Sequence, residues 1–300
     1  MNRILVVGSV ALDTVTTPFG KCSDVLGGSA TYFSVSASHF SPVEVVAVVG
    51  SDFPSRHIKF LKSKKINLNG LKTIKGKTFR WEGEYSWDFG NPKTIATHLN
   101  VFSDFDPEVP REYRASKYVF LANIDPRLQK KVLNQMVNPR IVACDTMNYW
   151  IENKRNDLIR LLKEVDIFFV NESEAKELTG EVGLVAAARA MLSFGPKKVI
   201  IKKGEHGSLL FSSDSIFSTP AFLLETIFDP TGAGDTFAGG VMGYLASSGS
   251  LSEKALRKAI VYGSVMATFA VRDFSLRRLG AVKKPDIMKK FSEFKQLTQF

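Results

Sequence analysis

The stretch Asp-Pro-Thr-Gly-Ala-Gly-Asp-Thr at residues 229–236 runs directly into the small, apolar segment Phe-Ala-Gly-Gly-Val-Met-Gly-Tyr-Leu-Ala at 237–246. The proline and the glycines predict a tight loop, and the residues after it predict a closely packed helix. The N-terminus of a helix attracts negative charge through its free N–H groups and its dipole. Asp235 stands at that electropositive position. An anion-binding loop beside a carboxylate suits the transfer of a phosphoryl group to a hydroxyl group.

The same string resembles the C-terminal signature of the ribokinase-like (PfkB) carbohydrate kinase family. The resemblance implies that the amides of Gly232, Ala233 and Gly234 hold the phosphoryl group and that Asp235 accepts the proton of the acceptor hydroxyl. It also implies ATP and Mg²⁺ as cofactors. The alternative is an ordinary junction between a loop and a helix, with an aspartate capping the helix. The full string favours the kinase interpretation, because a lone Gly-x-Gly would be too common to support it.

The amino-acid composition is typical of a globular protein. Of its 300 residues, 44% are hydrophobic, which is ample for a core, and no apolar run approaches the ~20 residues of a membrane span. The N-terminus lacks the features of a signal peptide. Cys22 and Cys144 are too far apart to suggest a disulfide framework or a Cys-x-x-Cys metal site. We therefore expect a protein of the reducing cytoplasm.

The formal net charge of +10 comes from basic residues dispersed along the chain. Short clusters at 62–65 and 72–77 predict a solvated, lysine-rich surface rather than an arm that binds nucleic acid. Such a surface gives a mild attraction for anionic substrates such as ATP. We expect neither a nucleic acid nor a membrane as partner.

Short β-branched runs alternate with helical patterns along most of the chain. This alternation predicts one domain over 1–300, with a mainly parallel sheet between two layers of helices. The resemblance makes this the ribokinase-like three-layer α/β/α fold. The predicted strands are 4–9, 44–49, 117–121, 140–144, 166–170 and 198–202, and the predicted helices are 28–40, 53–64, 126–137, 151–163, 172–179 and 183–193.

Two regions break the alternation. Residues 11–27 are polar and rich in turns, while 77–103 have strand-like composition and a turn at 90–92. Together they predict a small antiparallel flap. The family has a lid built from two such regions, which closes over the acceptor and often pairs with a second subunit, so the resemblance implies a homodimer formed through the lid.

Aromatic residues recur in the second of these regions with alternating spacing. That spacing predicts that all of them lie on one face, and they are Phe79, Trp81, Tyr85, Trp87 and Phe89. A hydrophobic dimer seam or a lid core is one interpretation. Stacking on a nucleobase acceptor is the other.

The acceptor side of the resemblance rests on residues near the N-terminus. Gly27, Gly28 and Ser29 open the first predicted helix, and they match a diglycine that contributes to binding the acceptor hydroxyls. Asp13 matches an early aspartate that accepts hydrogen bonds from those hydroxyls. The alternatives are a pair of helix-capping glycines and an aspartate in a surface turn.

One position departs from the family pattern. Family members commonly carry an asparagine four residues after the second glycine, and this chain has Tyr32 there. The acceptor pocket therefore differs from the ribokinase pattern at this position. Asn123 and Asp145 end two other predicted strands, and both are candidates for contact with the acceptor; Asp145 is equally a candidate for the water network around a metal ion.

Asn171 and Glu174 follow the predicted strand 166–170 and resemble the Asn-x-x-Glu motif with which the family organises Mg²⁺ through water. Mg²⁺ keeps several of its waters, so a sparse acidic element suits it. The alternative is a capping box that starts a helix, and both roles are compatible. Asp229 and Thr231 match residues that bind a monovalent cation in several relatives, which makes K⁺ a candidate cofactor.

The resemblance also implies residues for the nucleotide. Lys203 and Gly204 lie in the turn after strand 198–202, where an ordinary hairpin turn is the alternative. Tyr262 and Gly263 are the candidates for the adenine pocket. Thr231, Gly232 and Gly234 would contact the phosphates.

The sequence thus predicts an ATP-dependent kinase that phosphorylates a hydroxyl group of a small sugar, polyol or nucleoside. A helix N-terminus is expected to lower the pKa of Asp235 and make it a weak base. The alternative is a catalytically inert binding or regulatory protein on the same scaffold. The sequence does not identify the acceptor.

Overall fold

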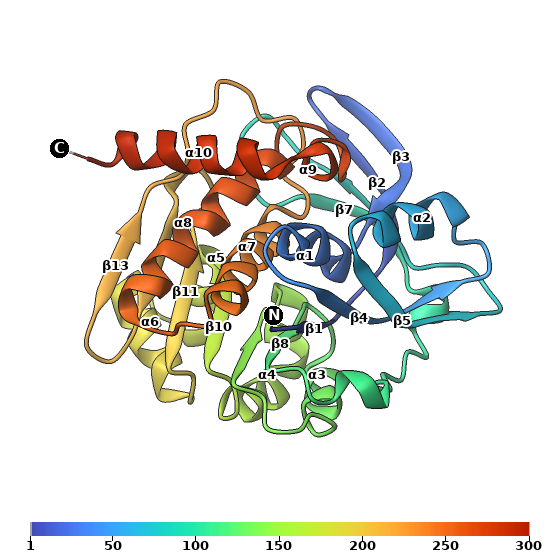
Figure 1. Cartoon of the computed structure of the whole chain (residues 1–300), viewed down its shortest axis with the longest axis horizontal. Coiled ribbons are helices and arrows are strands. Elements are labelled where there is room, and N and C mark those ends of the chain that lie inside the picture. Colours follow the sequence, from blue (N-terminus) through green and yellow to red (C-terminus); the bar gives the residue numbers. More distant parts are fainter. Residues whose placement is uncertain (1, 300) are drawn as a thin grey trace.

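Nine strands form the main sheet of the computed structural model, which describes residues 2–299 (Figure 1). Their order across the sheet is β13-β12-β11-β10-β9-β8-β1-β4-β5. All neighbouring pairs from β11 to β5 are parallel, and β12 and β13 add two antiparallel strands at one edge. The strands are β1 (Ile4–Val7), β4 (Val43–Gly50), β5 (Ile66–Ile74), β8 (Tyr118–Leu121), β9 (Ile141–Cys144), β10 (Ile167–Asn171), β11 (Lys198–Lys202), β12 (Ser208–Phe211) and β13 (Ile216–Thr219).

Helices cover both faces of this sheet, because successive side chains of each buried strand point to opposite sides. Ile4 and Val6 join the hydrophobic cluster on one face, and Leu5 and Val7 join the cluster on the other. The first face is covered by α1 (Ser29–Ser38), α2 (Ser55–Ser63), α7 (Ala233–Ser248), α8 (Glu253–Ala270), α9 (Arg277–Ala281) and α10 (Lys284–Leu297). The second is covered by α3 (Pro126–Leu133), α4 (Asn148–Leu162), α5 (Glu172–Thr179) and α6 (Leu184–Ser193). The predicted three-layer α/β/α fold is confirmed.

Helix α7 packs unusually close to its neighbours. A Cβ atom on Gly239 would lie 2.4 Å from the carbonyl oxygen of Phe33 in α1, and one on Gly240 would lie 2.9 Å from the Cα of Gly263 in α8. The small residues after the 229–236 loop therefore let three helices meet backbone to backbone. This packing fixes the N-terminus of α7, and with it Asp235, against the sheet.

The predicted strands and helices are present, with shifted ends. Three strands of the main sheet were not predicted: β5, β12 and β13. The helix expected at 126–137 ends at Leu133, and the one expected at 151–163 begins at Asn148. Edge strands β5 and β13 carry many polar or exposed residues, so they lack the continuous apolar run that identified the buried strands. The two cysteines are both free. Among the described residues, no helix combines the length and the apolar character needed to cross a membrane.

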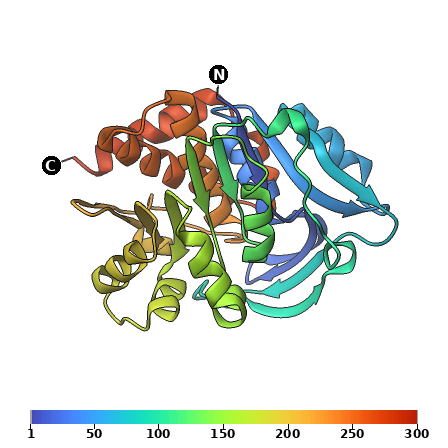
Figure 2. The same cartoon turned by 90° about the horizontal axis from the view of Figure 1, so that it is seen from below.

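Four further strands form a second, smaller sheet in the order β3-β2-β6-β7. They are β2 (Ala11–Thr17), β3 (Gly20–Gly27), β6 (Arg80–Glu84) and β7 (Lys93–His98), and they lie together in Figure 2 as blue and teal strands. The two regions that break the alternation thus form one lid. The lid is not purely antiparallel as predicted, because its two antiparallel hairpins are joined by a parallel pairing of β2 with β6.

The prediction that five lid aromatics share one face was wrong. Strand β6 ends at Glu84, and a register shift between Glu82 and Gly83 breaks its alternation. Trp81, Tyr85 and Phe89 pack with Val15, Cys22 and Phe274 in a small lid core, whereas Phe79 stacks on Phe102 with ring centroids 5.4 Å apart. Trp87 is 76% exposed.

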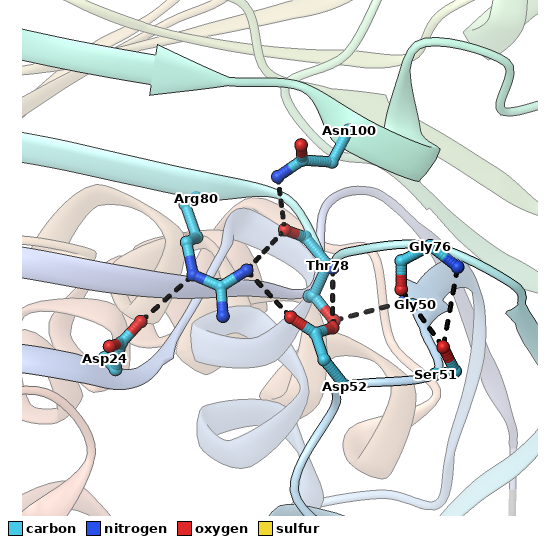
Figure 3. Close-up of polar contacts among 8 residues, drawn as sticks. All are labelled: Asp24, Gly50, Ser51, Asp52, Gly76, Thr78, Arg80 and Asn100. Atoms are coloured by element: carbon cyan, nitrogen blue, oxygen red, sulfur yellow. Dashed lines mark hydrogen bonds and ion pairs between the residues drawn. The ribbon is translucent and has the colours of Figure 1, made fainter.

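A polar network ties the lid to the loop that follows β4 (Figure 3). The Asp52 carboxylate accepts hydrogen bonds from the backbone N–H of Thr78 at 2.7 Å and from its hydroxyl at 2.6 Å, and it pairs with Arg80 at 2.9 Å. Arg80 also pairs with Asp24 of β3 at 3.0 Å. Burial alone would raise the pKa of Asp52, but the hydrogen bonds from Thr78 and Arg80 lower it below its usual value. The ionised carboxylate therefore holds the lid on the body.

We predict that Asp52→Asn loosens the lid, because an amide replaces the charged acceptor for Thr78 and Arg80. The free energy of unfolding should fall by about 1 kcal/mol at pH 7. Amide hydrogen exchange within 78–98 should accelerate, while the main sheet stays protected. Glu108→Gln, which removes a surface ion pair with Lys72, is the matched control. Unchanged exchange in the lid of Asp52→Asn would show that this network does not hold it.

Candidate active site

The 229–236 loop makes a turn that only glycine accommodates. Gly232 caps α7 with φ +72°, and a Cβ atom there would lie 2.3 Å from the ring of Tyr32. The N–H of Ala233 donates to the carbonyl of Pro230 at 3.1 Å and is used within the turn. Within residues 2–299, no protein acceptor takes the amides of Gly232 and Gly234. These two amides, rather than all three predicted ones, are free for a ligand.

The Asp229 side chain holds the 229–236 loop in place by accepting two backbone hydrogen bonds. One of its oxygens accepts from the N–H of Thr231 at 2.9 Å and the other accepts from the N–H of Ser275 at 3.0 Å. The side chain is buried, so both contacts are structural. The Thr231 hydroxyl lies 3.3 Å from the phenol oxygen of Tyr85, which brings the lid into contact with the loop. A cation role for Asp229 stays a prediction.

Asp235 lies in the first turn of α7, partly buried. Burial raises its pKa to about 7, and the neighbouring carboxylate of Asp145 acts in the same direction, while Lys202 opposes them. The expectation that the helix N-terminus lowers this pKa was therefore wrong, because the loss of solvent and the second carboxylate outweigh the dipole. A carboxylate that titrates near neutrality is a better general base than one of ordinary pKa.

Three adjacent parallel strands bring polar side chains to the same edge of the sheet as Asp235. Asp145 follows β9, Asn171 ends β10 and Lys202 ends β11, with Asn171 and Lys202 paired in register. The Nζ of Lys202 lies 2.6 Å from a carboxylate oxygen of Asp145, and both side chains are largely buried. Sequence reasoning chose Lys203 and missed Lys202, although Lys202 ends a buried strand at the carboxyl edge, where ligands of open α/β sheets collect.

Asn171 and Glu174 form a complete capping box at the start of α5. The Glu174 N–H donates to Asn171 Oδ1 at 2.8 Å, and the Asn171 N–H donates to Glu174 Oε2 at 2.7 Å. Burial raises the pKa of Glu174 to about 7, with Lys202 lowering it and Asp145 raising it. No three His, Cys, Asp or Glu side chains within residues 2–299 are grouped so as to hold a metal ion. Mg²⁺ would fit here only with most of its oxygens from water and phosphate, as it commonly binds.

The structure brings the diglycine and Asp13 close together. A Cβ atom on Gly27 would lie 1.8 Å from Asp13 Oδ2, and Gly28 has φ +94°. Burial raises the pKa of Asp13 to about 7, although a hydrogen bond from the Gly28 backbone lowers it. Ser29 is held by Ser9, in the segment that follows β1: its N–H donates to Ser9 Oγ at 3.0 Å and the two hydroxyls lie 3.2 Å apart. Ser29 thus has a structural role, and its contact with the acceptor stays a prediction.

Tyr32 and Asn123 are also engaged by the protein. Tyr32 is buried beneath Gly232, and burial, followed by Asp229 and Asp13, raises its pKa well above the usual value. Its ring packs directly against Gly232 of the 229–236 loop, which explains how an aromatic residue is accommodated at position 32. Asn123 Oδ1 accepts from the indole N–H of Trp150 at 2.9 Å, which leaves its amide nitrogen for a ligand.

The predicted nucleotide residues divide into two groups. Lys203 and Gly204 lie in the hairpin turn between β11 and β12, where the Lys203 N–H donates to the Gly207 carbonyl at 2.8 Å. Tyr262 stacks between Tyr244 and Phe291, with centroids 4.8 and 4.4 Å away. Gly263 is buried against α7. Neither Tyr262 nor Gly263 presents a free face to a nucleotide, so helix packing replaces the predicted adenine contact.

Comparison with known proteins identifies the class of this chain. The model of the pfkB family carbohydrate kinases matches residues 1–279. A cytidine kinase of Thermococcus kodakarensis is 33% identical over 247 residues, covering 81% of this chain and 88% of that protein. The chain belongs to the pfkB family and is a kinase of that family.

Solved structures support the same fold. The nucleoside kinase of Methanocaldococcus jannaschii superposes with a TM-score of 0.79 at 19% identity, covering 98% of this chain and 99% of that one. The Burkholderia thailandensis nucleoside kinase, in complex with inosine, gives 0.78 at 17% identity, with 97% of each chain covered.

We predict that Gly27→Ala disrupts the acceptor side, because the added methyl group would displace the Asp13 carboxylate. The free energy of unfolding should fall by about 1–3 kcal/mol, and acceptor-dependent ADP release should be lost. Gly183→Ala is the matched control, since a Cβ atom there meets nothing within 4 Å. A Gly27→Ala variant as stable and active as the Gly183→Ala control would refute the close contact with Asp13.

Proposed function

We propose that this pfkB-family kinase transfers the γ-phosphoryl group of ATP to a hydroxyl group of a nucleoside, with Asp235 as general base. One observation carries this proposal: a carboxylate with a pKa of about 7 stands beside the free amides of Gly232 and Gly234 at the N-terminus of α7. The amides suit an anion, and the carboxylate suits the hydroxyl that attacks it.

In the proposed reaction the acceptor oxygen forms a bond to the γ-phosphorus. The bond from that phosphorus to the β,γ-bridging oxygen breaks, its electrons stay with ADP, and the hydroxyl proton passes to Asp235. Asp13 would orient the acceptor by accepting hydrogen bonds from neighbouring hydroxyls. Mg²⁺ would supply positive charge to the phosphates, and Asn171 and Glu174 would orient its waters.

A nucleoside is the acceptor that the comparisons and the lid favour. The relative with 33% identity is a cytidine kinase. In the turn between β2 and β3, exposed Phe19 lies 5.9 Å from Trp87 and 5.2 Å from Phe228 between ring centroids, and Phe228 directly precedes the Asp229 loop. Exposed aromatic rings suit stacking on a base. The same exposed rings would equally suit the homodimer seam expected from the sequence.

We predict that Asp235→Asn folds normally and loses turnover by about 10²–10⁴-fold, because the amide cannot accept the proton. Its melting temperature should equal or exceed that of the wild type at pH 8, since the raised pKa shows that the charged carboxylate is disfavoured by burial. Asp214→Asn, in the exposed β12–β13 turn, is the control. A folded Asp235→Asn variant with wild-type turnover would exclude Asp235 as the base.

We predict an acid limb in the pH profile of kcat/KM. Asp235 acts as a base only when deprotonated, so kcat/KM should fall at least tenfold per pH unit below about 6 and level off above about 7.5. Asp13 and Glu174, whose pKa values also lie near 7, would steepen this limb. A profile that stays flat from pH 5.5 to 8.5 would contradict the assigned base.

We predict that nucleosides, rather than free sugars or inositols, elicit ADP release in a screen of acceptors. Trp87→Ala should then raise the KM for the nucleoside about tenfold, because stacking contributes about 1–3 kcal/mol per base. Light scattering on the same variant separates the two roles of the lid. Loss of dimers with an unchanged KM would assign Trp87 to a subunit seam, and a response to sugars alone would refute the nucleoside proposal.

A further inference from the structure

Lys202 is a charged side chain that the proposed chemistry has not yet used. It ends β11 with its side chain 16% exposed, and its ion pair is with Asp145, which is 4% exposed. Burial alone would lower the pKa of Lys202, but Asp145 and Glu174 together raise it, so the ammonium group is charged at neutral pH. Burying such a pair is costly and seldom stabilises a fold.

The position of Lys202 relative to the anion-binding loop is more specific than its burial. A Cβ atom on Gly234 would lie 3.2 Å from Nζ and 3.6 Å from Cδ of Lys202. The lysine side chain therefore passes directly beside the Cα of Gly234, whose amide is free for a ligand. A methyl group on Gly234 would therefore crowd the ammonium group, which would have to move by a few tenths of an ångström.

The ammonium group also has hydrogen-bonding capacity left. It carries three N–H donors, and the described residues supply one acceptor within hydrogen-bond distance, the Asp145 carboxylate at 2.6 Å. Asp235, which directly follows Gly234 in sequence, also raises the pKa of Lys202, after Asp145 and Glu174. Two donors thus remain beside the amide that would bind a phosphoryl group.

We propose that Lys202 is a catalytic residue of the phosphoryl transfer, donating a hydrogen bond from Nζ to an oxygen of the phosphoryl group as it moves. This inference rests on the proposed function. The bonds formed and broken are those given above, and Lys202 keeps its proton throughout. Its charge offsets the negative charge on the phosphoryl oxygens, and Asp145 holds the ammonium group in position.

The experiment removes the charge of Lys202 without leaving Asp145 as an unpaired buried carboxylate. In the double variant Lys202→Met/Asp145→Asn both charges are absent, so the fold should persist with a melting temperature close to that of the wild type. The kcat should fall about 100-fold, as expected for one donor to the transition state, with the acceptor KM nearly unchanged. Lys197→Met, which breaks an ion pair with Asp166 at the opposite end of β11, is the control.

A second measurement reports on phosphoryl binding without turnover. In the wild type with acceptor present, aluminium fluoride should tighten the binding of ADP measured by calorimetry. The aluminium fluoride complex mimics the phosphoryl group as it is transferred. The double variant should bind ADP alone normally and lose most of this tightening. If it fails to fold, Lys202→Gln, which keeps a hydrogen bond to Asp145 without a charge, should show the same two losses.

The outcomes separate this inference from the function on which it rests. A folded variant that lacks the Lys202 charge, turns over within threefold of the wild type and keeps the fluoride effect would assign the lysine a structural role and overturn the inference alone. A wild-type chain that releases no ADP with any acceptor, and shows no fluoride effect, would overturn the proposed function and this inference with it.

Discussion

The close approach of α7 to α1 and α8 is the constraint on which the site depends. Gly239 and Gly240 let the helix backbones touch, and this holds α7 against one face of the sheet. The same principle continues at the start of the helix, where Gly232 rests on the ring of Tyr32. A side chain at any of these positions would displace the N-terminus of α7. The anion-binding loop is therefore an outcome of helix packing as much as of local turn geometry.

Charge balance at the edge of the sheet follows from this placement. Parallel strands β9, β10 and β11 end together, so Asp145 and Lys202 lie near Asp235, and Glu174 lies near both Asp145 and Lys202. Burial penalises every charge there, which brings two of the carboxylates to pKa values near 7. Lys202 offsets part of the repulsion between the carboxylates. The site in this state thus has an excess of negative charge, and a bound phosphate group calls for the additional positive charge that Mg²⁺ would supply.

The sequence predicted the parts of this arrangement that are local. The loop, the parallel strands and the two lid segments each have a pattern that reports directly on backbone structure. The lid aromatics were misplaced because the end of β6 and its register shift depend on pairing with β7. The pKa of Asp235 was misjudged because it depends first on burial in the folded chain and then on Asp145, which is 90 residues away in sequence. Lys202 was missed for the same reason: a lysine after an apolar run resembles a solvated strand end until the ion pair with Asp145 is seen.

A crystal structure with ADP, aluminium fluoride and a nucleoside acceptor tests the central claim most directly. The account predicts that the fluoride group accepts from the amide of Gly234 and that an Asp235 oxygen lies about 3 Å or less from the attacking hydroxyl. A nucleotide whose terminal phosphate lies away from the 229–236 loop, with Asp235 out of reach of the acceptor, would contradict it.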